Sequence, residues 1–464
     1  MSEAAGTRTG AASANIEASN KPGRLPTTQP TGPTGLACRR ASLRALEACF
    51  FRGQPLDDAF APLRTSLSAS DAGLAWAICQ EVARERLRLK TLKTAFLKRG
   101  LPKNAAAVGM ILDIALVQLL KLDVAPHAAI STAVELAKRD KRPAVKSHAK
   151  LINGVLRNAL RKRAAGALYL PPAHKALPDW LVKRWRSQYG QAGIEALAQC
   201  YLTSPPLHVT AKSPDAQGQL LRHSSAFDFK AHAAFPAGTA LTDLPGFESG
   251  AIWAQDRCAA LPALILNPPK GAVCYDLCAA PGGKTMQLAA MGADVVAVDS
   301  SKTRLERLKQ NLKRTNMQAE IVHANVSDWV PPVAADYILL DAPCTALGTF
   351  QRHPDVVHHR RAVDITSRAA LQADILRGAW KALNPGGVLV YAVCSLEPEE
   401  GEALLDAFVS EAGDAERVPI TAEDYGLPKL CETPSGGIAT APHHVMESGG
   451  GDGFYIAKLR RKTA

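Results

Sequence analysis

The amino-acid sequence predicts a multidomain protein with an all-helical (all-α) front, a small α+β subdomain and a C-terminal α/β domain of the doubly wound type. Two patterns support this fold class. Between Arg40 and about Ala165, apolar residues recur at spacings of three and four, as in helices that bury one face. From Ala251 onward, short apolar runs alternate with helical segments, which indicates a parallel sheet covered on both faces. The boundaries we expect are 1–36 for a tail, then 37–165, 166–248 and 249–464.

Composition and charge indicate a globular protein with a polyanionic partner. The chain of 464 residues is 47% hydrophobic and 21% charged, and its formal net charge is +12. This basic balance favours nucleic acid as the partner, although a generally basic protein would have the same balance. The 10 cysteines show no paired metal spacing, so we expect a reducing compartment, no zinc site and no disulfide framework.

No stretch of the sequence has the character of a membrane span or a secretory signal. Residues 1–36 are rich in small and polar residues, which predicts disorder and excludes the apolar centre of a signal peptide. The most apolar later stretch, Ala105–Leu120, contains Asp113 and Gln118 and is too short and too polar to cross a bilayer. We therefore expect a cytoplasmic protein, and we expect it to be a monomer.

Helices dominate the front of the chain. The predicted helices cover Ser42–Phe51, Gly73–Phe96, Ala105–Leu120, Ala128–Lys138 and Ser147–Arg163. The last helix has the clearest pattern, with a buried stripe of Leu151, Ile152, Val155, Leu156, Ala159 and Leu160. Another of its faces carries Lys146, Lys150, Arg157 and Arg161. That basic face suits a phosphate backbone, and it equally suits ordinary contact with solvent.

A proline-rich linker, Ala164 to Pro178, leads into the small subdomain. We expect a helix at Asp179–Ala198, a strand at Leu207–Thr210 and a helix at Ala216–Arg222, with the subdomain reaching about Phe247. The strands expected in the α/β domain are Ala272–Tyr275, Asp294–Val298, Glu320–His323, Tyr337–Leu340, Gly387–Ala392 and Gly453–Arg460. Asn384-Pro385-Gly386-Gly387 predicts a turn before the fifth of them, and the last strand is expected to close the sheet.

The stretch Val273–Thr285 (VCYDLCAAPGGKT) predicts a strand, a glycine turn and the start of a helix. This order presents backbone N–H groups to a ligand at the carboxyl edge of a sheet. The next strand ends at Asp299, where a carboxylate suits the two hydroxyls of a ribose. The turn matches neither the dinucleotide fingerprint nor a P-loop, so a nucleoside ligand such as S-adenosylmethionine fits better. A glycine turn alone is also compatible with a tight βα connection.

Two further strands bring reactive groups to the same edge. Ile338–Leu340 runs into Asp341-Ala342-Pro343-Cys344, and Val388–Tyr391 runs toward Cys394. A thiolate that adds to carbon 6 of a pyrimidine makes carbon 5 able to accept a methyl group, after which a base removes the carbon 5 proton and the thiol leaves. Asp341, kept protonated by a desolvated site, would assist at ring nitrogen 3. The alternative is that both cysteines are small buried hydrophobes.

These motifs resemble those of a known family. The chain is similar to the Sun/Fmu-type RNA cytosine-5 methyltransferases of 16S ribosomal RNA in DLCAAPGGKT (Asp276–Thr285), DAPC (Asp341–Cys344), RHPD (Arg352–Asp355) and Cys394-Ser395 with Pro398-Glu399-Glu400. Ala149–Arg161 resembles the NusB-like RNA-binding domain that precedes the catalytic domain in this family. The resemblance runs from about Arg40 to the end. It implies a Rossmann-like class I methyltransferase domain that uses S-adenosylmethionine and needs no metal.

The resemblance also implies a role for each site residue. The methionine part of the cofactor would be wrapped by Cys278, Ala279, Ala280, Pro281, Gly282, Gly283 and Lys284. Asp299 would bind the ribose, and Asp341 would lie at the cofactor and the target base. Cys394 would be the nucleophile and Cys344 would serve product release. Without the family we would choose Cys344 as the nucleophile, because DNA cytosine methyltransferases attack with the cysteine of a Pro-Cys pair.

The chain departs from the family pattern at two places. Asn325 stands where the family has an aspartate that contacts the adenine amine; its side-chain oxygen can still accept, and Asp328 is a less suitable substitute. His208 and Thr210 stand where the family has Arg and Asn, so the RNA site is transferred less securely than the chemistry. We expect the phosphates flanking the flipped base to contact Arg352, His353, Arg360 and Arg361, with a packing or capping role as the alternative for His353.

Two alternative functions stay open at this point. The same chemistry could act on transfer RNA or on another ribosomal site. A non-catalytic RNA-binding or antitermination factor would keep the NusB-like front and a vestigial cofactor fold. The joint presence of both cysteines, Lys284 and Asp341 argues against that factor, because a dead site does not need them together.

Overall fold

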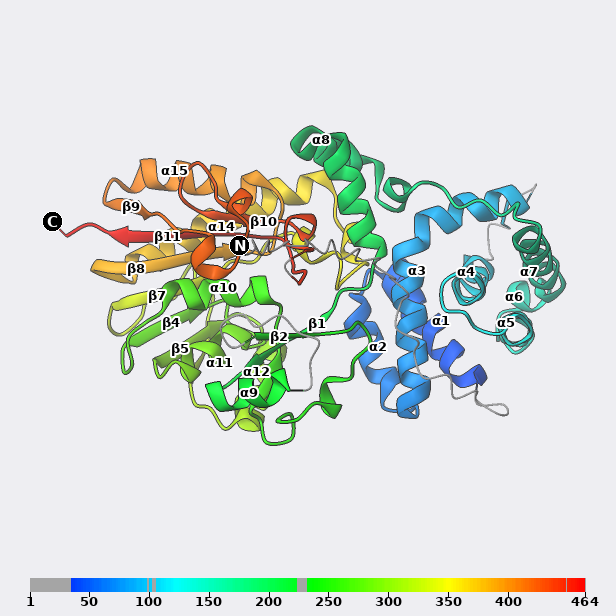
Figure 1. Ribbon diagram of the computed structural model, residues 1–464, viewed down its shortest axis with the longest axis horizontal. Helices are drawn as coiled ribbons and strands as arrows, with labels where there is room; N and C mark the ends of the chain where they lie inside the picture. The colour runs from blue at the N-terminus through cyan, green and yellow to red at the C-terminus, as the bar shows by residue number, and fades with distance from the viewer. Residues whose placement is uncertain (1–34, 98–99, 102–105, 223–231, 448, 464) are drawn as a thin grey trace, which may run out of the picture.

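The computed structural model describes residues 35–97, 100–101, 106–222, 232–447 and 449–463. All but the last two residues of the expected tail, 1–36, lie outside this range, and residues 35–36 begin the first helix. Figure 1 shows the helical domain, coloured blue to cyan, beside the sheet domain, with α8 above their junction.

The helical domain contains every helix that the periodicity predicted. Its elements are α1 (Gly35–Arg52), α2 (Leu56–Arg64), α3 (Ala69–Phe96), α4 (Ala106–Leu120), α5 (Pro126–Lys138), α6 (Pro143–Lys146) and α7 (Ala149–Ala164). The sequence missed α2 and α6, because α2 is short and contains Pro62 and α6 has a single turn. α1 and α3 also begin earlier than expected.

Helix α4 forms the centre of this domain. Its residues 107–119 are all buried, as expected of a helix that is apolar on every side. Its two polar side chains have partners inside the core: Asp113 accepts from Lys93 Nζ at 2.6 Å and Gln118 Oε1 accepts from Arg39 Nε at 2.7 Å. Within the described residues, no helix has the length and apolarity needed to cross a membrane.

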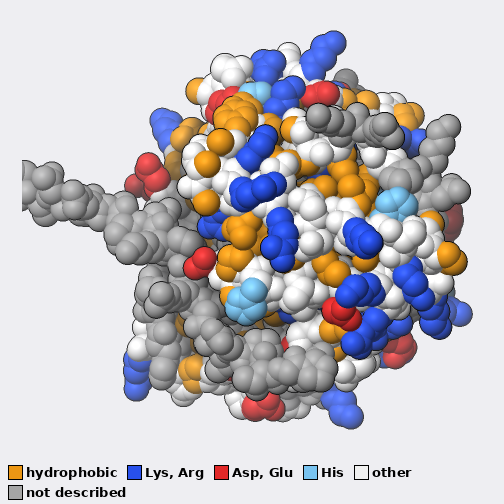
Figure 2. Space-filling model, turned by 90° about the vertical axis from the view of Figure 1, so that its right-hand side faces the viewer, with side chains coloured by type: hydrophobic (Ala, Val, Ile, Leu, Met, Phe, Trp, Pro, Cys, Tyr) orange, Lys and Arg blue, Asp and Glu red, His pale blue; other side chains and the backbone are white. Residues whose placement is uncertain are grey.

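Helix α7 has the two faces that its sequence predicted. Of the predicted stripe, Ile152, Val155, Leu156 and Ala159 are buried, and Leu151 and Leu160 are partly buried. Lys150, Arg157, Arg161 and the preceding Lys146 are exposed. On the outer end of the helical domain, Figure 2 shows many Lys and Arg side chains among apolar and uncharged ones, and few acidic side chains. The charge of this face is therefore positive, as RNA binding requires.

The small subdomain is a three-stranded sheet with one helix. α8 (Asp179–Leu202) precedes it, and the sheet has the order β2-β1-β3, from β1 (Leu207–Ala211), β2 (His232–Phe235) and β3 (Ile252–Ala254), with α9 (Pro214–Leu221) after β1. The strand at the expected position of β1 is present. The third strand is supplied by residues beyond the boundary that we expected at 248.

The α/β domain contains a mixed 8-stranded sheet of order β10-β11-β8-β7-β4-β5-β6, with β9 paired to β11. Its strands are β4 (Val273–Leu277), β5 (Asp294–Asp299), β6 (Glu320–His323), β7 (Ala335–Asp341), β8 (Leu383–Val393), β9 (Ala415–Val418), β10 (Ile438–Thr440) and β11 (Phe454–Arg461). Its helices are α10 (Arg257–Leu266), α11 (Gly283–Ala290), α12 (Lys302–Thr315), α13 (Val356–His359), α14 (Ala362–Lys381) and α15 (Glu402–Ala412). The run from β8 to β6 is parallel, which confirms the expected doubly wound core.

Two expectations about this sheet were wrong. The last strand, β11, does not close the sheet but lies between β8 and β10, antiparallel to both. The Asn384–Gly387 segment is not a turn before the fifth strand. It lies inside β8, where the register against β7 shifts between Ala335 and Tyr337 and Gly386 adopts a φ of 82°. The glycines accommodate extra residues in one strand, which is a β-bulge.

Candidate active site

The glycine turn joins β4 to α11 as the sequence predicted. Cys278 and Gly282 both have left-handed backbone, with φ of 61° and 102°. A Cβ at Gly282 would lie 3.0 Å from Leu308 Cγ, so the turn needs glycine there for both conformation and space. Ala279 N–H donates to the Val298 carbonyl of β5 at 3.1 Å, which fixes the turn at the carboxyl edge of the sheet.

The carboxyl group of Asp276 is buried at the end of β4. Its Oδ2 accepts from Thr285 Oγ1 at 2.6 Å, and its Oδ1 has no partner among the described residues. Burial raises the pKa of Asp276 to about 7, because a carboxylate loses its hydration there. An unpartnered buried oxygen next to the glycine turn is a group that a bound ligand or water can satisfy.

Asp299 lies at the end of β5, as expected for a ribose-binding carboxylate. Its Oδ2 accepts from Ala280 N–H at 3.1 Å and its Oδ1 from Ser301 N–H at 2.8 Å. Arg304 of α12 lies over the carboxylate, with Nη1 3.6 Å from Oδ2 and a hydrogen bond from Nη2 to the Ala280 carbonyl. No pattern in the sequence pointed to Arg304, because it faces Asp299 only through the packing of α12.

Asn325 follows β6 at an exposed position. Its Oδ1 accepts from Ser327 N–H at 3.4 Å and its Nδ2 donates to Asp328 Oδ2 at 3.1 Å. Asp328 therefore orients Asn325 rather than replacing it. A carbonyl oxygen has a second lone pair, so Asn325 Oδ1 can still accept from an amine.

Lys284 and Asp341 form a close ion pair between α11 and β7. Lys284 Nζ lies 2.7 Å from Asp341 Oδ2 and 5.4 Å from the centre of the Phe454 ring. Burial opposes the charge of Lys284, but the Asp341 carboxylate outweighs it and raises the pKa of Lys284. The Asp341 side chain is 31% exposed and ion-paired, so it does not lie in the desolvated environment that we expected.

The two predicted cysteines meet at the ends of β7 and β8. Cys344 Sγ and Cys394 Sγ are 3.4 Å apart. The hydrogen bond with Cys344 and burial raise the pKa of the Cys394 thiol well above its usual range, and the Lys284 ammonium acts in the opposite direction. Cys344 and Cys394 are partly buried, whereas Cys274 of β4 is fully buried in the core.

A buried carboxylate that the sequence did not single out joins the two cysteine loops. Glu400 Oε1 accepts from Thr345 N–H at 2.8 Å and Gln372 Nε2 at 3.0 Å. Glu400 Oε2 accepts from Ser395 Oγ at 2.5 Å and from Thr345 Oγ1. Thr345 follows Cys344 and Ser395 follows Cys394, so Glu400 fixes both loops. The Pro-Glu-Glu run was the available signal, but it did not show which glutamate turns inward.

Arg352 is held by protein groups, which argues against the phosphate contact that we expected for it. Its guanidinium lies 3.2 Å from Asp452 Oδ1, hydrogen-bonds Asp256 and donates to the Pro206 carbonyl at 2.9 Å. His208 Nδ1 lies 2.9 Å from the same Asp256 carboxylate. Two buried carboxylates need a cation between them, and Arg352 supplies it.

The other expected RNA contacts near this loop also have protein partners. His353 Nδ1 lies 2.9 Å from Asp57 Oδ2 of α2, which favours the packing role that was its alternative. Thr210 is buried and donates to Gln255 Oε1 at 3.0 Å. His208 is buried as well, so neither departure from the family pattern lies on the surface of the protein. Arg360 and Arg361 remain accessible.

The residues at this edge suit a nucleoside cofactor. The turn lies beside an unpartnered Asp276 oxygen, and the two following strands offer the oxygens of Asp299 and Asn325. Hydroxyl and amine groups are recognised by acceptors of this kind. In the described residues one possible metal-ligand group, Cys49 with Asp355 and His359, lies at the domain junction and not at the cysteine pair.

Comparison with known proteins defines the family. The family model for 16S rRNA methyltransferase RsmB/F matches residues 263–460, and the NusB family model matches residues 37–161. Ribosomal RNA small subunit methyltransferase B of Shigella flexneri is 35% identical over 443 residues, which cover 91% of this chain and 98% of that protein. The chain belongs to this methyltransferase B family. The protein of that name from Escherichia fergusonii is 36% identical over 452 residues, with the same coverage.

Solved structures share the fold of this methyltransferase B family member. The crystal structure of PH0851 has a TM-score of 0.76 at 20% identity and covers 93% of this chain and 100% of its own. A methyltransferase homolog from Pyrococcus horikoshii is 28% identical with a TM-score of 0.52, covering 61% of this chain and 95% of its own. The predicted NusB-like front and Rossmann-like methyltransferase domain are thereby confirmed. The protein is an S-adenosylmethionine-dependent RNA methyltransferase.

Proposed function

We propose that the protein methylates carbon 5 of a cytosine in 16S ribosomal RNA through a covalent bond between Cys394 and carbon 6. The observation that carries this proposal is the thiol pair, with Cys344 Sγ and Cys394 Sγ 3.4 Å apart at the sheet edge that bears the glycine turn. A thiol is the group that pyrimidine carbon 5 chemistry requires, and this edge also carries the Lys284–Asp341 ion pair. The protein is expected to act as a monomer in the cytoplasm.

The cofactor residues follow from the same edge. Residues 278–284 would wrap the methionine part of S-adenosylmethionine, which supplies an electrophilic methyl group. Asp299 would accept the ribose hydroxyls once Arg304 moves aside, because Arg304 covers that carboxylate in the structure. Asn325 would accept from the adenine amine. These roles rest on the positions of the strand ends and on the family pattern.

The covalent steps assign one task to each cysteine. Cys394 gives up its proton and its sulfur forms a bond to carbon 6, which places electron density on carbon 5. Carbon 5 then accepts the methyl group. In the last step carbon 5 loses its proton to a base and the carbon–sulfur bond breaks, which returns the thiolate. Cys344, adjacent to Cys394, is positioned for this release step.

Lys284 and Asp341 set the charge around these steps. The Lys284 ammonium favours the Cys394 thiolate, which counteracts the burial that disfavours it. Asp341 is paired as a carboxylate, so it suits accepting a hydrogen bond from the exocyclic amine of cytosine.

A methylation assay tests the proposal. In vitro transcribed 16S ribosomal RNA, incubated with the protein and labelled S-adenosylmethionine, should take up label, and bisulfite sequencing should locate it at a single cytosine. Transfer RNA under the same conditions should stay unlabelled. Label on transfer RNA alone would keep the chemistry and overturn the substrate. A protein that neither labels RNA nor shows a thermal shift with S-adenosylmethionine would be the non-catalytic alternative.

A further inference from the structure

A basic hollow opens beside the catalytic loops, between α13 and α14. Its volume is about 400 Å³, within the range of small-ligand sites, and its walls include Arg360, Arg361, Asp364 and Arg368. The single carboxylate of the hollow is already engaged, because Asp364 accepts from Arg361 N–H at 2.8 Å and lies 3.4 Å from the Arg361 guanidinium. Within the described residues, Arg360 and Arg368 form no ion pair. The hollow therefore keeps a positive charge.

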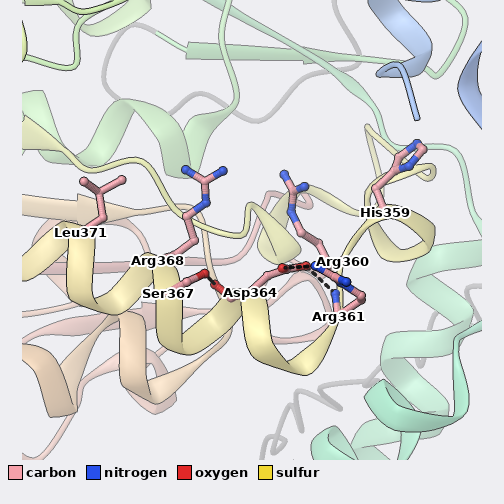
Figure 3. Close-up of a pocket in the computed structure, with 7 residues that line it drawn as sticks. All are labelled: His359, Arg360, Arg361, Asp364, Ser367, Arg368 and Leu371. Carbon is pink, nitrogen blue, oxygen red and sulfur yellow. Dashed lines mark hydrogen bonds and ion pairs between the residues drawn. The ribbon is translucent and has the colours of Figure 1, made fainter. Parts of the chain in front are cut away.

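Side-chain directions give the hollow a defined binding side. Figure 3 shows the guanidinium groups of Arg360 and Arg368 extended to the same side of α14, while Arg361 turns back to Asp364. The Arg361 side chain is 78% exposed, so it lies at the rim. Guanidinium groups bind phosphate oxygens with paired N–H donors, and two that point the same way can share one phosphodiester.

Hydrogen bonds link the hollow to the residues that follow the two cysteines. Arg360 Nε donates to the Thr345 carbonyl at 2.7 Å, and Thr345 follows Cys344. Thr345 Oγ1 in turn lies 3.2 Å from Ser395 Oγ, next to Cys394. We therefore expect a strand whose base enters the site to run past this hollow. Arg352 and His353, which we also expected to contact phosphates, have protein partners instead.

We propose that Arg360, Arg361 and Arg368 bind the backbone phosphate next to the target cytosine. The proposal rests on the proposed function for the position of the target base, and it adds a phosphate site that includes Arg368. A base that leaves its stack needs its strand held on either side, and phosphate contacts supply this without reading sequence. The occupant is the sugar–phosphate chain of the substrate RNA.

Salt-dependent RNA binding tests this site without requiring methylation. We compare wild type, Arg368→Gln, Arg368→Lys and Arg377→Gln for binding to 16S ribosomal RNA transcript and to single-stranded polyuridylate, over a range of salt concentrations. Arg377 is the matched control, because it lies on the same helix but pairs with Glu411 at 2.8 Å. Among the described residues Arg368 forms no hydrogen bond or ion pair with the cysteine loops, whereas Arg360 donates to the Thr345 carbonyl. An Arg368 variant therefore tests phosphate binding without disturbing the geometry of these loops.

The expected result is weaker binding of both RNAs by Arg368→Gln, with the slope of log affinity against log salt reduced by about 0.7 for one lost single-strand phosphate contact. Arg368→Lys should recover most of the slope, and Arg377→Gln should match wild type. A wild-type slope in Arg368→Gln, or an equal loss in Arg377→Gln, would overturn the site. Absence of methylation with these slope changes present would instead count against the proposed function alone.

Discussion

Cys394 lies among groups with opposite effects on its ionisation. The hydrogen bond with Cys344 and burial raise the pKa of Cys394, and Lys284 lowers it. In the proposed reaction the nucleophile is a thiolate, so the balance of these groups would limit the fraction of reactive enzyme at neutral pH. The sequence predicted that both cysteines meet, because parallel strands end at one edge. It could not predict the ion pair of Asp341, which depends on the length and direction of the Lys284 side chain.

Replacing Cys344 by alanine should shift the ionisation of Cys394 to lower pH. The variant removes the hydrogen bond that is the largest cause of the raised pKa, so the thiolate should form at a lower pH than in wild type. Alkylation of the Cys394 peptide by iodoacetamide, followed by mass spectrometry from pH 6 to 11, measures this midpoint. The alkylation of Cys278 in the same sample provides a control. A Cys394 midpoint that stays in place or rises would contradict this account of its environment.

At the scale of elements, the site depends on how the loops after β7 and β8 are tied together. Glu400 performs this by accepting from both loops and from Gln372 of α14. Hydrophobic periodicity predicted the strands that carry the site, because each is a short apolar run. It missed the short strands β9 and β10, both of which pair with β11 in the antiparallel direction. It also misplaced the Asn384–Gly387 turn, because a bulge and a turn use the same residues.

Glu400→Gln should lower kcat while cofactor affinity stays unchanged. In the variant, an amide N–H₂ group would face the donors of Thr345, Gln372 or Ser395 and could not accept from them. Each lost hydrogen bond to a charged acceptor costs about 1.5–3 kcal/mol. If one such loss disturbs the geometry of the transition state, kcat should fall about 10- to 100-fold. Glu399→Gln is the matched control, since Glu399 is half exposed and pairs with Arg184 at the surface. Equal kcat values for the two variants, measured with saturating RNA, would show that Glu400 does not position the loops.

At the scale of the whole molecule, the RHPD loop (Arg352–Asp355) contacts the helical domain, the small subdomain and the rest of the α/β domain. The Arg352 guanidinium contacts Pro206 just before β1, Asp256 just before α10, and Asp452. Asp355 Oδ2 accepts from Leu56 N–H of the helical domain at 3.0 Å, and Arg84 of α3 donates to the Gln351 carbonyl at 2.8 Å. Sequence reasoning placed this loop on RNA because its residues are basic. The partners of Arg352 and His353 on other elements follow from domain packing, which no local pattern of the chain encodes.

Arg352→Gln should destabilise the protein strongly. It leaves Asp256 and Asp452 buried next to each other without a cation, and breaking a buried ion pair costs about 3–5 kcal/mol. Arg307→Gln is the control: its pair with Asp58 also bridges the two domains, but both side chains are about half exposed, so the loss should stay below about 1 kcal/mol. Urea unfolding at pH 7 measures both. Similar losses in the two variants would show that Arg352 is not the clamp of this junction.

The central claim is that Cys394 attacks the cytosine and Cys344 releases the product. Wild type, Cys394→Ala and Cys344→Ala are incubated with 16S ribosomal RNA transcript and S-adenosylmethionine, and protein–RNA adducts are resolved on denaturing gels. We predict that Cys344→Ala accumulates an adduct and that Cys394→Ala forms neither adduct nor methylated RNA. An adduct that forms in Cys394→Ala and disappears in Cys344→Ala would reverse the two roles and contradict the account.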